Sequence, residues 1–545
     1  MDLEIPIGKR KPMYRIFEIL PAVLSYSAIL ALIILSLISP TLGSIYLLLV
    51  IVSVLVKVIA SVYRMAGGHR ALKQAGEVSW YRRLQQLEDP KSSYAKLRNR
   101  NSRKYQYRQH VENLRLMAAA EEGYFPKPSE IYNAAIVAMY NETIEVLKPT
   151  IDAIVNTDYP NDRIILVLAY EERGGPDIEA VAKELKKVYK GVFFDLLTIK
   201  HPDGLPNEVV GKGGNITYAG KGLQKYLDKR GIKYSDVIVT TQDSDNRQAR
   251  NYFSYLTYQY ICHENRKHLS YQPVALFTQN IWDVPAPMRV VAMGNSFWNI
   301  ISTMRLHSLR NFAAHSQPMD ALVEMNFWST RTIVEDGHQY WRSYFFFNGN
   351  YGVVPLRTVI YQDAVMSFSF VKTLKAQFVQ VRRWYYGASD IPYVATRVLV
   401  RDRRVPLLQG IARLWRLIDS HVTLAIMPLM VALGAWVPLL INQGSARSPI
   451  ANQLPNVVSI VQTIAMIGLF TMIILTLRMI PKRPERYRKY RVLGMLTQWV
   501  LLPVTTIVYN SLSAFYAQTR LALGLYMEKF DVTDKATFET AKRKK

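Results

Sequence analysis

The 545-residue sequence predicts an α/β fold with a doubly wound, mostly parallel sheet, inserted between α-helical transmembrane segments. Two observations predict this class. First, residues 19–39, 43–63, 422–441 and 457–477 form mostly apolar runs, and runs of about 20 such residues are long enough to cross a bilayer. Second, short apolar runs alternate with amphipathic stretches from residue 131 onward, as they do in β-α-β units.

The expected strands are four short apolar runs between the second and third long segments. They cover residues 134–139, 164–169, 192–197 and 237–241, and helices are expected between them at 142–155 and 178–189. Ligands of doubly wound sheets bind beyond the carboxyl ends of the strands. We therefore expect functional residues directly after each strand.

The charge distribution predicts the orientation of the chain in a membrane. Net charge is +26, and basic residues concentrate at 9–15, 64–115 and 482–491, whereas 442–456 carries only Arg447. The positive-inside rule then puts the N-terminus, the middle region and the 482–491 loop in the cytoplasm. Nucleic-acid binding would also account for so basic a chain. Charge beside apolar spans is more often a topology signal, so we expect no nucleic-acid partner.

Further features fit this organisation. The first apolar run is too long for a signal peptide and lacks a small-residue cleavage site, so we expect it to be retained. Cys262 is the only cysteine, which excludes an intramolecular disulfide. Residues 64–130 read as a basic, helical cytoplasmic connector lying near anionic headgroups. Residues 393–418 read as one amphipathic helix in the membrane interface.

Four short motifs occur in chain order. They are Asp243-Ser244-Asp245, Glu335-Asp336, the Q-x-x-R-W element from Gln380 to Trp384, and the F-x-V-T-x-K element from Phe530 to Lys535. About one D-x-D match is expected by chance in a chain this long, whereas Q-x-x-R-W is expected in only roughly one such chain in fifty. The set is therefore far more informative than its first member.

In this order and membrane context, the motifs resemble those of membrane-embedded family-2 glycosyltransferases of the cellulose, chitin and hyaluronan synthase type. The resemblance covers about residues 131–384 and the C-terminal motif. It implies an inverting, metal-dependent enzyme at the cytoplasmic face of the plasma (inner) membrane. The implied reaction transfers a hexose from a nucleotide sugar, first of all a UDP-sugar, to a growing polysaccharide.

The resemblance also implies a donor site. Asp243 and Asp245 would bind Mg²⁺ or Mn²⁺, and the implied nucleotide-sugar contacts are Glu142, Glu171, Lys212, Asn215, Asp243 and Arg383. Glu171 departs from the family pattern, which has an Asp-Asp or Asp-Gly pair at the end of the second strand. Each motif also has a plainer reading: a solvated loop for Asp243, a first-turn helix acid for Glu142, and a flexible turn for Lys212.

The acceptor side follows from the later motifs. Asp336 is the implied general base with Glu335 beside it, although Val334 stands where the family has threonine. Gln380 and Trp384 would hold the acceptor sugar. The plainer readings are an acidic helix N-terminus and an interfacial tryptophan with snorkelling arginines.

The last motif resembles a gating loop, with Thr533 and Lys535 contacting the nucleotide. Such a loop must share a compartment with Asp243. Residues 492–526 would then have to cross the membrane and return, giving six spans. The expected division of the chain is 1–63 (tail and two spans), 64–130 (connector), 131–392 (catalytic domain), 393–418 (interfacial helix), 419–527 (about four helices) and 528–545 (gating loop and tail).

Two other functions stay open at this point. A non-processive enzyme that glycosylates a lipid would share the Q-x-x-R-W element. A catalytically silent membrane scaffold could keep the fold and bind a partner through the basic connector. The polysaccharide or lipid acceptor, the nucleotide sugar and the membrane are thus the expected partners.

Overall fold

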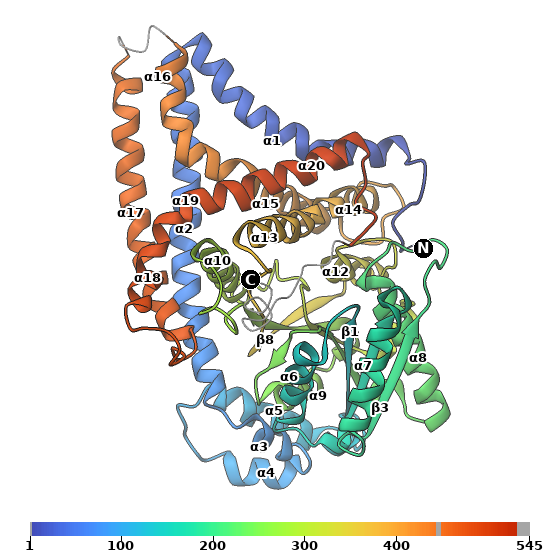
Figure 1. The fold of residues 1–545 in the computed structure, drawn as a ribbon. Coiled ribbons are helices and arrows are strands. Elements are labelled where there is room, and N and C mark those ends of the chain that lie inside the picture. Colours follow the sequence, from blue (N-terminus) through green and yellow to red (C-terminus); the bar gives the residue numbers. More distant parts are fainter. Residues whose placement is uncertain (1–2, 443–447, 531–545) are drawn as a thin grey trace.

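The computed structural model describes residues 3–442 and 448–530. It combines an α/β domain with long helices that gather to one side of that domain (Figure 1). The domain is formed mainly by the middle of the chain, whereas the long helices come from both ends.

One eight-stranded sheet forms the centre of the domain. Its strands are β1 (Tyr132–Met139), β2 (Ile164–Glu171), β3 (Asp195–His201), β4 (Val237–Asp243), β5 (Arg247–Gln248), β6 (Leu269–Leu276), β7 (His315–Pro318) and β8 (Gly352–Tyr361). Their spatial order is β3-β2-β1-β4-β7-β6-β8-β5. The first four are parallel to one another, and β6 is parallel to β8. The pairs β4–β7, β6–β7 and β5–β8 are antiparallel.

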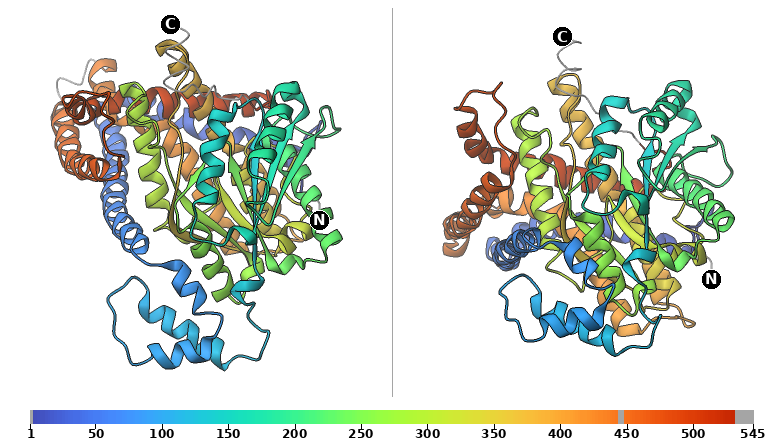
Figure 2. Two further views of the ribbon diagram at one scale, coloured as in Figure 1. Left: turned by 60° about the horizontal axis from the view of Figure 1, so that its bottom comes forward. Right: turned by 90° about the horizontal axis from the view of Figure 1, so that it is seen from below.

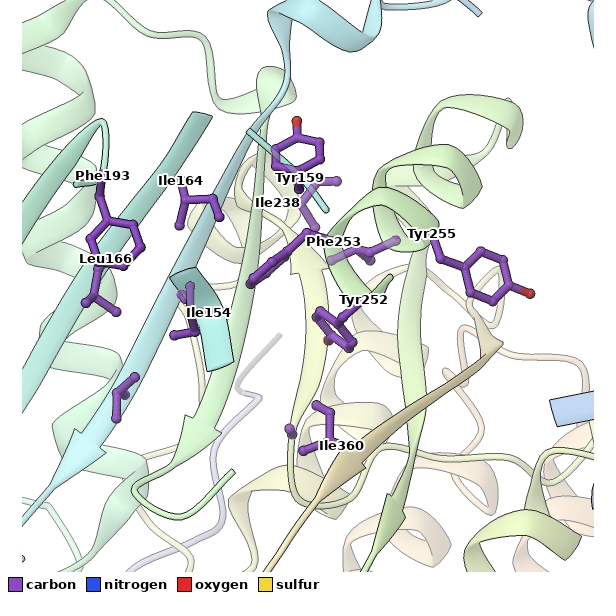
Figure 3. Packing of buried hydrophobic residues seen from close by; sticks show 14 of the residues in the cluster. Ile154, Tyr159, Ile164, Leu166, Phe193, Ile238, Tyr252, Phe253, Tyr255 and Ile360 are labelled. Carbon is purple, nitrogen blue, oxygen red and sulfur yellow. The ribbon is translucent and has the colours of Figure 1, made fainter. Parts of the chain in front are cut away.

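Side chains that alternate along the strands build a separate core on each face of the sheet. On one face, Leu166 and Ile238 pack with Ile154, Phe253 and their neighbours from the covering helices (Figure 3). On the other face, Ile165 and Val239 pack against another helix. Such a period of two is what a sheet covered on both faces requires.

The domain's helices cover both faces. They are α6 (Ile144–Val155), α7 (Gly175–Val188), α8 (Lys212–Arg230), α9 (Tyr252–Cys262), α10 (Ala286–Ser302), α11 (Met319–Glu324), α12 (Glu335–Phe346), α13 (Phe370–Tyr385) and α14 (Asp390–Val398). Helices α6, α7 and α9 contribute to the first core and α8 to the second. The predicted α/β, doubly wound class is therefore confirmed. The third strand begins three residues later than expected.

Five helical stretches in the described part of the chain are long and apolar enough to cross a membrane. They are α1 (Pro12–Ile38), α2 (Pro40–Gly76), the stretch Leu407–Ile441 containing α15 (Leu407–Leu433) and α16 (Val437–Ile441), α17 (Pro449–Met479), and the stretch Arg491–Leu523. The last contains α18 (Arg491–Thr497), α19 (Leu502–Thr505), a π-helical turn (Thr506–Leu512) and α20 (Ser513–Leu523).

Two expectations about these helices are wrong. Arg491–Leu523 is helical throughout and contains no reversal, so the crossing and return expected within 492–526 is absent. Residues 393–418 form parts of α14 and α15 rather than one helix, with a break between them. Pro406 explains the break, because the residue before a proline is disfavoured in the helical conformation.

The connector is helical, as expected. Its helices α3 (Trp80–Gln85), α4 (Pro90–Leu97) and α5 (Tyr107–Ala119) lie at the end of the molecule remote from α16 and α17 (Figures 1 and 2). The 37 residues of α2 span about 55 Å at 1.5 Å per residue, which carries the chain well past a membrane. The expectation that the connector lies near headgroups stays a prediction. The connector packs on the domain, with Trp80 stacked on Tyr255 at 3.7 Å between ring centroids.

Three segments distant in sequence contact the α/β domain. Near the N-terminus, Arg342 donates to Glu4 at 2.8 Å. In the loop before α18, Arg486 donates to Asp283 at 2.7 Å. After α20, the backbone N–H of Phe530 donates to Val210 at 2.8 Å. Both ends of the stretch Arg491–Leu523 therefore lie against the α/β domain.

Candidate active site

The Asp243-Ser244-Asp245 turn begins where β4 ends. The side chain of Asp243 is about one-third exposed, whereas Asp245 is buried. Thr150 donates to the carbonyl oxygen of Ser244 at 2.7 Å and fixes the turn on α6. The first carboxylate therefore faces the outside of the sheet edge.

Glu142 holds this turn in place. Its Oε1 accepts a hydrogen bond from the Ser244 hydroxyl at 2.9 Å, and its Oε2 accepts one from the backbone N–H of Tyr140 at 2.7 Å. The carboxylate thus ties the loop after β1 to the loop after β4. Glu142 was predicted to contact the nucleotide, and in this structure both of its oxygens have protein partners.

Lys212 is the centre at which the carboxylates converge. It is the first residue of α8 and is buried. Its Nζ lies 3.0 Å from Asp243 Oδ1, 3.2 Å from Asp336 Oδ2 and 3.8 Å from Glu335 Oε1. Burial alone would lower the pKa of Lys212, but these carboxylates raise it above its usual value. Lys212 is therefore positively charged and joins the first and second motifs.

Glu335 and Asp336 are the first two residues of α12. Acidic residues are favoured in this first turn by the helix dipole. Burial raises the pKa of both carboxyls above their ordinary values, and the charges of Lys212 and Arg383 oppose that rise. An elevated carboxyl pKa suits a group that accepts a proton near neutral pH.

His315 on β7 is a neighbour that the sequence did not reveal. Its Nδ1 lies 3.6 Å from Asp336 Oδ1, and its Nε2 accepts a hydrogen bond from the Trp328 indole at 3.3 Å. Burial, together with the charge of Lys212, lowers the pKa of His315 to about 3. The ring is therefore neutral. The sequence gives little indication of this histidine, because the four-residue strand that carries it has no alternating apolar pattern.

A second unpredicted pair lies behind α12. His338 Nδ1 is 2.6 Å from Asp390 Oδ1, and both side chains are buried. Asp390 is the first residue of α14, which follows the Q-x-x-R-W helix. The pair therefore fixes the helix that carries Asp336 against the segment that follows Trp384.

The remaining predicted donor residues lie at the ends of β1 and β2. The Asn215 amide donates to the carbonyl oxygen of Ala169 at 2.9 Å, which joins α8 to β2. Glu171 is buried and forms an ion pair with Arg173, whose guanidinium lies 4.3 Å from the Tyr140 ring centroid. A cavity of about 70 Å³ opens beside this ion pair, between Glu171, His201 and Gly211.

The Q-x-x-R-W residues occupy the last two turns of α13. Gln380 accepts a hydrogen bond from Gln377 at 3.1 Å, and Trp384 is 36 % exposed with Phe277 beside it. The Arg383 guanidinium lies 3.6 Å from the ring centroid of Phe530. Because the charge of Arg383 acts on both Asp336 and Glu335, the third motif lies near the carboxylates.

A divalent metal would have to bind carboxylates that already have protein partners, such as Asp243, which is paired with Lys212. Among the described residues, no set of three or more histidine, cysteine or acidic side chains is arranged to hold a metal. Asp243 offers a partly exposed carboxylate, and Asp245 Oδ2 accepts a long hydrogen bond of 3.4 Å from the Asp363 backbone. Hard oxygen donors of this kind fit Mg²⁺ or Mn²⁺ when phosphate oxygens complete the coordination.

The structure thus brings together Asp243, Lys212, Glu335 and Asp336, with Arg383 within electrostatic reach. Glu142 and Asn215 serve the loops around them. Thr533 and Lys535 lie outside the described residues.

Comparisons with known proteins give structural similarity only. No protein-family model and no curated protein sequence matches the chain. The structure is similar to the mannosyltransferase PcManGT from Pyrobaculum calidifontis in complex with GDP-Man and Mn²⁺, with 13 % identity, 85 % of this chain and 99 % of that chain covered, and a TM-score of 0.38. It is also similar to residues 1–349 of S. aureus TarS, with 12 % identity, 73 % and 93 % covered, and a TM-score of 0.34. GalNAc-T7 with UDP, GalNAc and Mn²⁺ is similar at 9 % identity, with 55 % of this chain and 59 % of that chain covered and a TM-score of 0.31.

Proposed function

We propose that this chain is an inverting, metal-dependent membrane glycosyltransferase that transfers a hexose from a nucleotide sugar, a UDP-sugar in the first place, to a growing polysaccharide. The observation that carries the proposal is the convergence of Asp243, Asp336 and Glu335 on Lys212 at the carboxyl edge of the sheet. Ligands of doubly wound sheets bind at this edge. An ion-pair network that only stabilised the fold would not need the Q-x-x-R-W helix, whose Arg383 acts on the carboxylates of Glu335 and Asp336.

The donor would bind at the ends of β1, β2 and β4. Asp243 and Asp245 would hold Mg²⁺ or Mn²⁺, which neutralises the pyrophosphate as it leaves. Arg383 would add a cation on the phosphates. Glu171 and Asn215 lie where the nucleoside part would reach, beside the cavity at the end of β2.

The transfer step then needs one base. The acceptor hydroxyl attacks the anomeric carbon, the bond to the nucleoside diphosphate breaks, and the hydroxyl proton passes to Asp336. The raised pKa of the Asp336 carboxyl suits this role. A direct displacement of this kind inverts the anomeric centre, and no covalent sugar–enzyme intermediate is needed.

The acceptor would lie along α13. Trp384 offers a partly exposed aromatic face for a sugar ring, and Gln380 offers an amide. Helix α13 also packs close to α20, since Arg382 donates to Tyr516 at 3.2 Å. Because α20 belongs to an apolar stretch of membrane length, this neighbourhood also favours the second candidate, a single transfer to a lipid acceptor.

The contacts of the chain ends support four membrane crossings. Glu4, Arg486 and Phe530 all contact the α/β domain. Each therefore lies on the same side of the membrane as that domain. Helices α1 and α2 would cross and return, as would Leu407–Ile441 and α17. The stretch Arg491–Leu523 then begins and ends on the same side, and we place it along the membrane surface. The basic segments assign that side to the cytoplasm.

Cysteine labelling tests this topology, because Cys262 is the only native thiol. In a Cys262→Ser background, Tyr490→Cys and Leu525→Cys probe exposed positions at the two ends of the stretch. Both should react with an impermeant maleimide only after cells are opened. Ile450→Cys, at the exposed start of α17, should react from outside. Labelling of Leu525→Cys in intact cells would mean that the stretch crosses.

Activity is tested with purified protein and radiolabelled UDP-glucose, UDP-N-acetylglucosamine, UDP-glucuronate and GDP-mannose, each with Mg²⁺, Mn²⁺ or EDTA. We expect metal-dependent transfer from one UDP-sugar and a long polymer on sizing. A single sugar on extractable lipid would select the second candidate. Nucleotide binding without transfer to any acceptor would favour the silent scaffold. Transfer that survives EDTA would remove the metal from the proposal.

A further inference from the structure

A cluster of basic side chains lies at the junction of three segments. It comprises Arg64 on α2, Arg305 and His307 just after α10, and Arg413 and Arg416 on α15. Burial and the charge of Arg64 lower the pKa of Arg305. Burial and the charges of the four arginines lower the pKa of His307. The five groups therefore lie within electrostatic reach of one another.

Packing contacts hold the three segments together. Gly68 of α2 lies so close to α10 that a Cβ at this position would be 2.7 Å from Ile300 Cγ2. Lys57 Nζ lies 3.1 Å from Asp419 Oδ1, which joins α2 to α15. Both contacts are within about three turns of the cluster, so the basic side chains converge because their backbones do.

The cluster lacks an internal counter-charge. Arg413 donates to the Tyr340 hydroxyl, but within residues 3–442 and 448–530 no carboxylate forms an ion pair with Arg64, Arg305 or Arg416. Asp419, the nearby acid on α15, is already paired with Lys57. Four like charges at one junction repel each other, and a bound anion would remove that cost.

Exposed aromatic and apolar side chains accompany the cluster. Tyr63 is 81 %, Trp298 50 % and Trp415 66 % exposed, and Leu306 is 61 % exposed. Each comes from one of the three converging segments. Tyrosine and tryptophan are enriched at the level of lipid headgroups, because one part of the ring is apolar and the other can donate a hydrogen bond.

The position along the chain matches that level. Arg64 follows directly after the apolar run of α2, and Arg416 precedes the apolar run that begins at Val422. Helices α2 and α15 are joined there by the Lys57–Asp419 ion pair. Both arginines therefore lie where the hydrocarbon region would end.

We propose that Arg64, Arg305, His307, Arg413 and Arg416 form a binding site for the phosphate of an anionic phospholipid, whose chains lie against Trp298, Trp415 and Leu306. Guanidinium groups match phosphate oxygens in charge and geometry, and basic pockets between membrane helices are suited to such headgroups. The site rests on the membrane embedding in the proposed function and is independent of the sugar chemistry.

The test is native mass spectrometry of protein released from bilayer discs that contain equal parts of phosphatidylglycerol and phosphatidylcholine. Wild-type protein should retain phosphatidylglycerol in preference to phosphatidylcholine. The triple variant Arg64→Gln, Arg305→Gln, Arg416→Gln should lose this retention at least about tenfold. The control Arg98→Gln, Arg100→Gln, Arg108→Gln removes the same charge from exposed connector positions and should retain the lipid.

Two further experiments distinguish lipid binding from the binding of soluble phosphate, and loss of binding from loss of folding. Inorganic phosphate and glycerol 3-phosphate at the same concentration should not displace the lipid. The single variant Arg416→Gln, at an exposed position, should fold normally and lose part of the retention. Equal retention by wild type and the triple variant, equal retention of phosphatidylcholine, or displacement by glycerol 3-phosphate would overturn the proposal. Retention by a protein that transfers no sugar would overturn the proposed function and leave this site standing.

Discussion

The proposed donor side and the proposed acceptor side of the candidate active site are built in different ways. On the donor side, Asp243, Lys212 and Asn215 lie at the ends of neighbouring β-α units and are held by buried contacts. On the acceptor side, Arg383 and Trp384 belong to a helix that meets segments from the other end of the chain, such as Phe530 and Tyr516. The donor side is therefore fixed by the sheet, whereas the acceptor side depends on how distant helices pack.

This difference fits the two proposed substrates. A soluble nucleotide sugar can be met by a preorganised set of charges, which costs little reorganisation during the reaction. An acceptor that reaches the site from the membrane needs an open, amphipathic surface, and Trp384 is partly exposed. Substitutions on the donor side should stop all chemistry, whereas those on the acceptor side should separate one reaction from another.

The largest effect should follow Asp243→Asn. The shape is kept while one negative charge is removed from the metal and from Lys212, so transfer and donor hydrolysis should both fall by at least about 10³-fold. Initial rates with the preferred UDP-sugar and Mn²⁺ measure this. The exposed Asp162→Asn is the control and should behave as wild type. Normal turnover in Asp243→Asn would show that this carboxylate is not needed for the metal.

Asp336→Asn should be nearly as severe but selective in another way. The base is lost while the donor contacts remain, so turnover should fall roughly 10²- to 10⁴-fold with nucleotide affinity nearly unchanged. Isothermal titration with UDP and steady-state rates together distinguish the two quantities. Asp402→Asn, in an exposed turn, is the matched change. A parallel collapse of nucleotide affinity would make Asp336 a binding residue.

Trp384→Ala should divide the two reactions. Loss of the aromatic surface should reduce transfer to acceptor by about 10- to 100-fold, as for other stacked anchors, while hydrolysis of the donor by water continues. Trp436→Ala removes a more exposed ring, 54 % against 36 %, from the Leu407–Ile441 stretch and should leave both rates unchanged. Equal loss of transfer and hydrolysis in Trp384→Ala would contradict an acceptor role.

The smallest effect should follow Tyr526→Phe. The Tyr526 hydroxyl donates to the buried Glu18 at 3.0 Å and accepts from Arg15 at 3.3 Å. Its loss should loosen the segment that carries Phe530 and raise the donor KM by a few-fold, in line with one hydrogen bond. Tyr490→Phe, at an exposed position, is the control. A loss as large as that of Asp243→Asn would place Tyr526 in the chemistry itself.

The part of this arrangement that the sequence predicts is again the part built by the first strands of the sheet. The first four strands and the carboxylates that follow them could be predicted, because buried parallel strands are apolar runs and their ends meet at one edge. The second half of the sheet was not predicted. Its strands β5 and β7 are short and pair with partners far along the chain, so local patterns carry little information about them.

The same reason explains the missed residues and the expected reversal within 492–526 that the structure does not show. His315 and the His338–Asp390 pair matter only through contacts between elements that are distant in the sequence. Hydropathy identified Arg491–Leu523 as apolar, whereas the proposal that it lies along the membrane comes only from the contacts of its two ends with the α/β domain. Six spans were inferred from the premise that the C-terminal motif shares a compartment with Asp243.

The contacts of the extreme N-terminus set an order of events during synthesis. Glu4 pairs with Arg342, and the hydroxyl of Tyr393 donates to the carbonyl oxygen of Leu3 at 2.9 Å. These partners are made 338 and 390 residues later, which takes on the order of 17–80 s at about 5–20 residues per second. The ribosome will therefore have produced α1, α2 and the strands β1–β7 before Glu4 can reach Arg342, and also β8 before Leu3 can reach Tyr393. Docking of the N-terminal segment should therefore be a late step in the folding of the α/β domain.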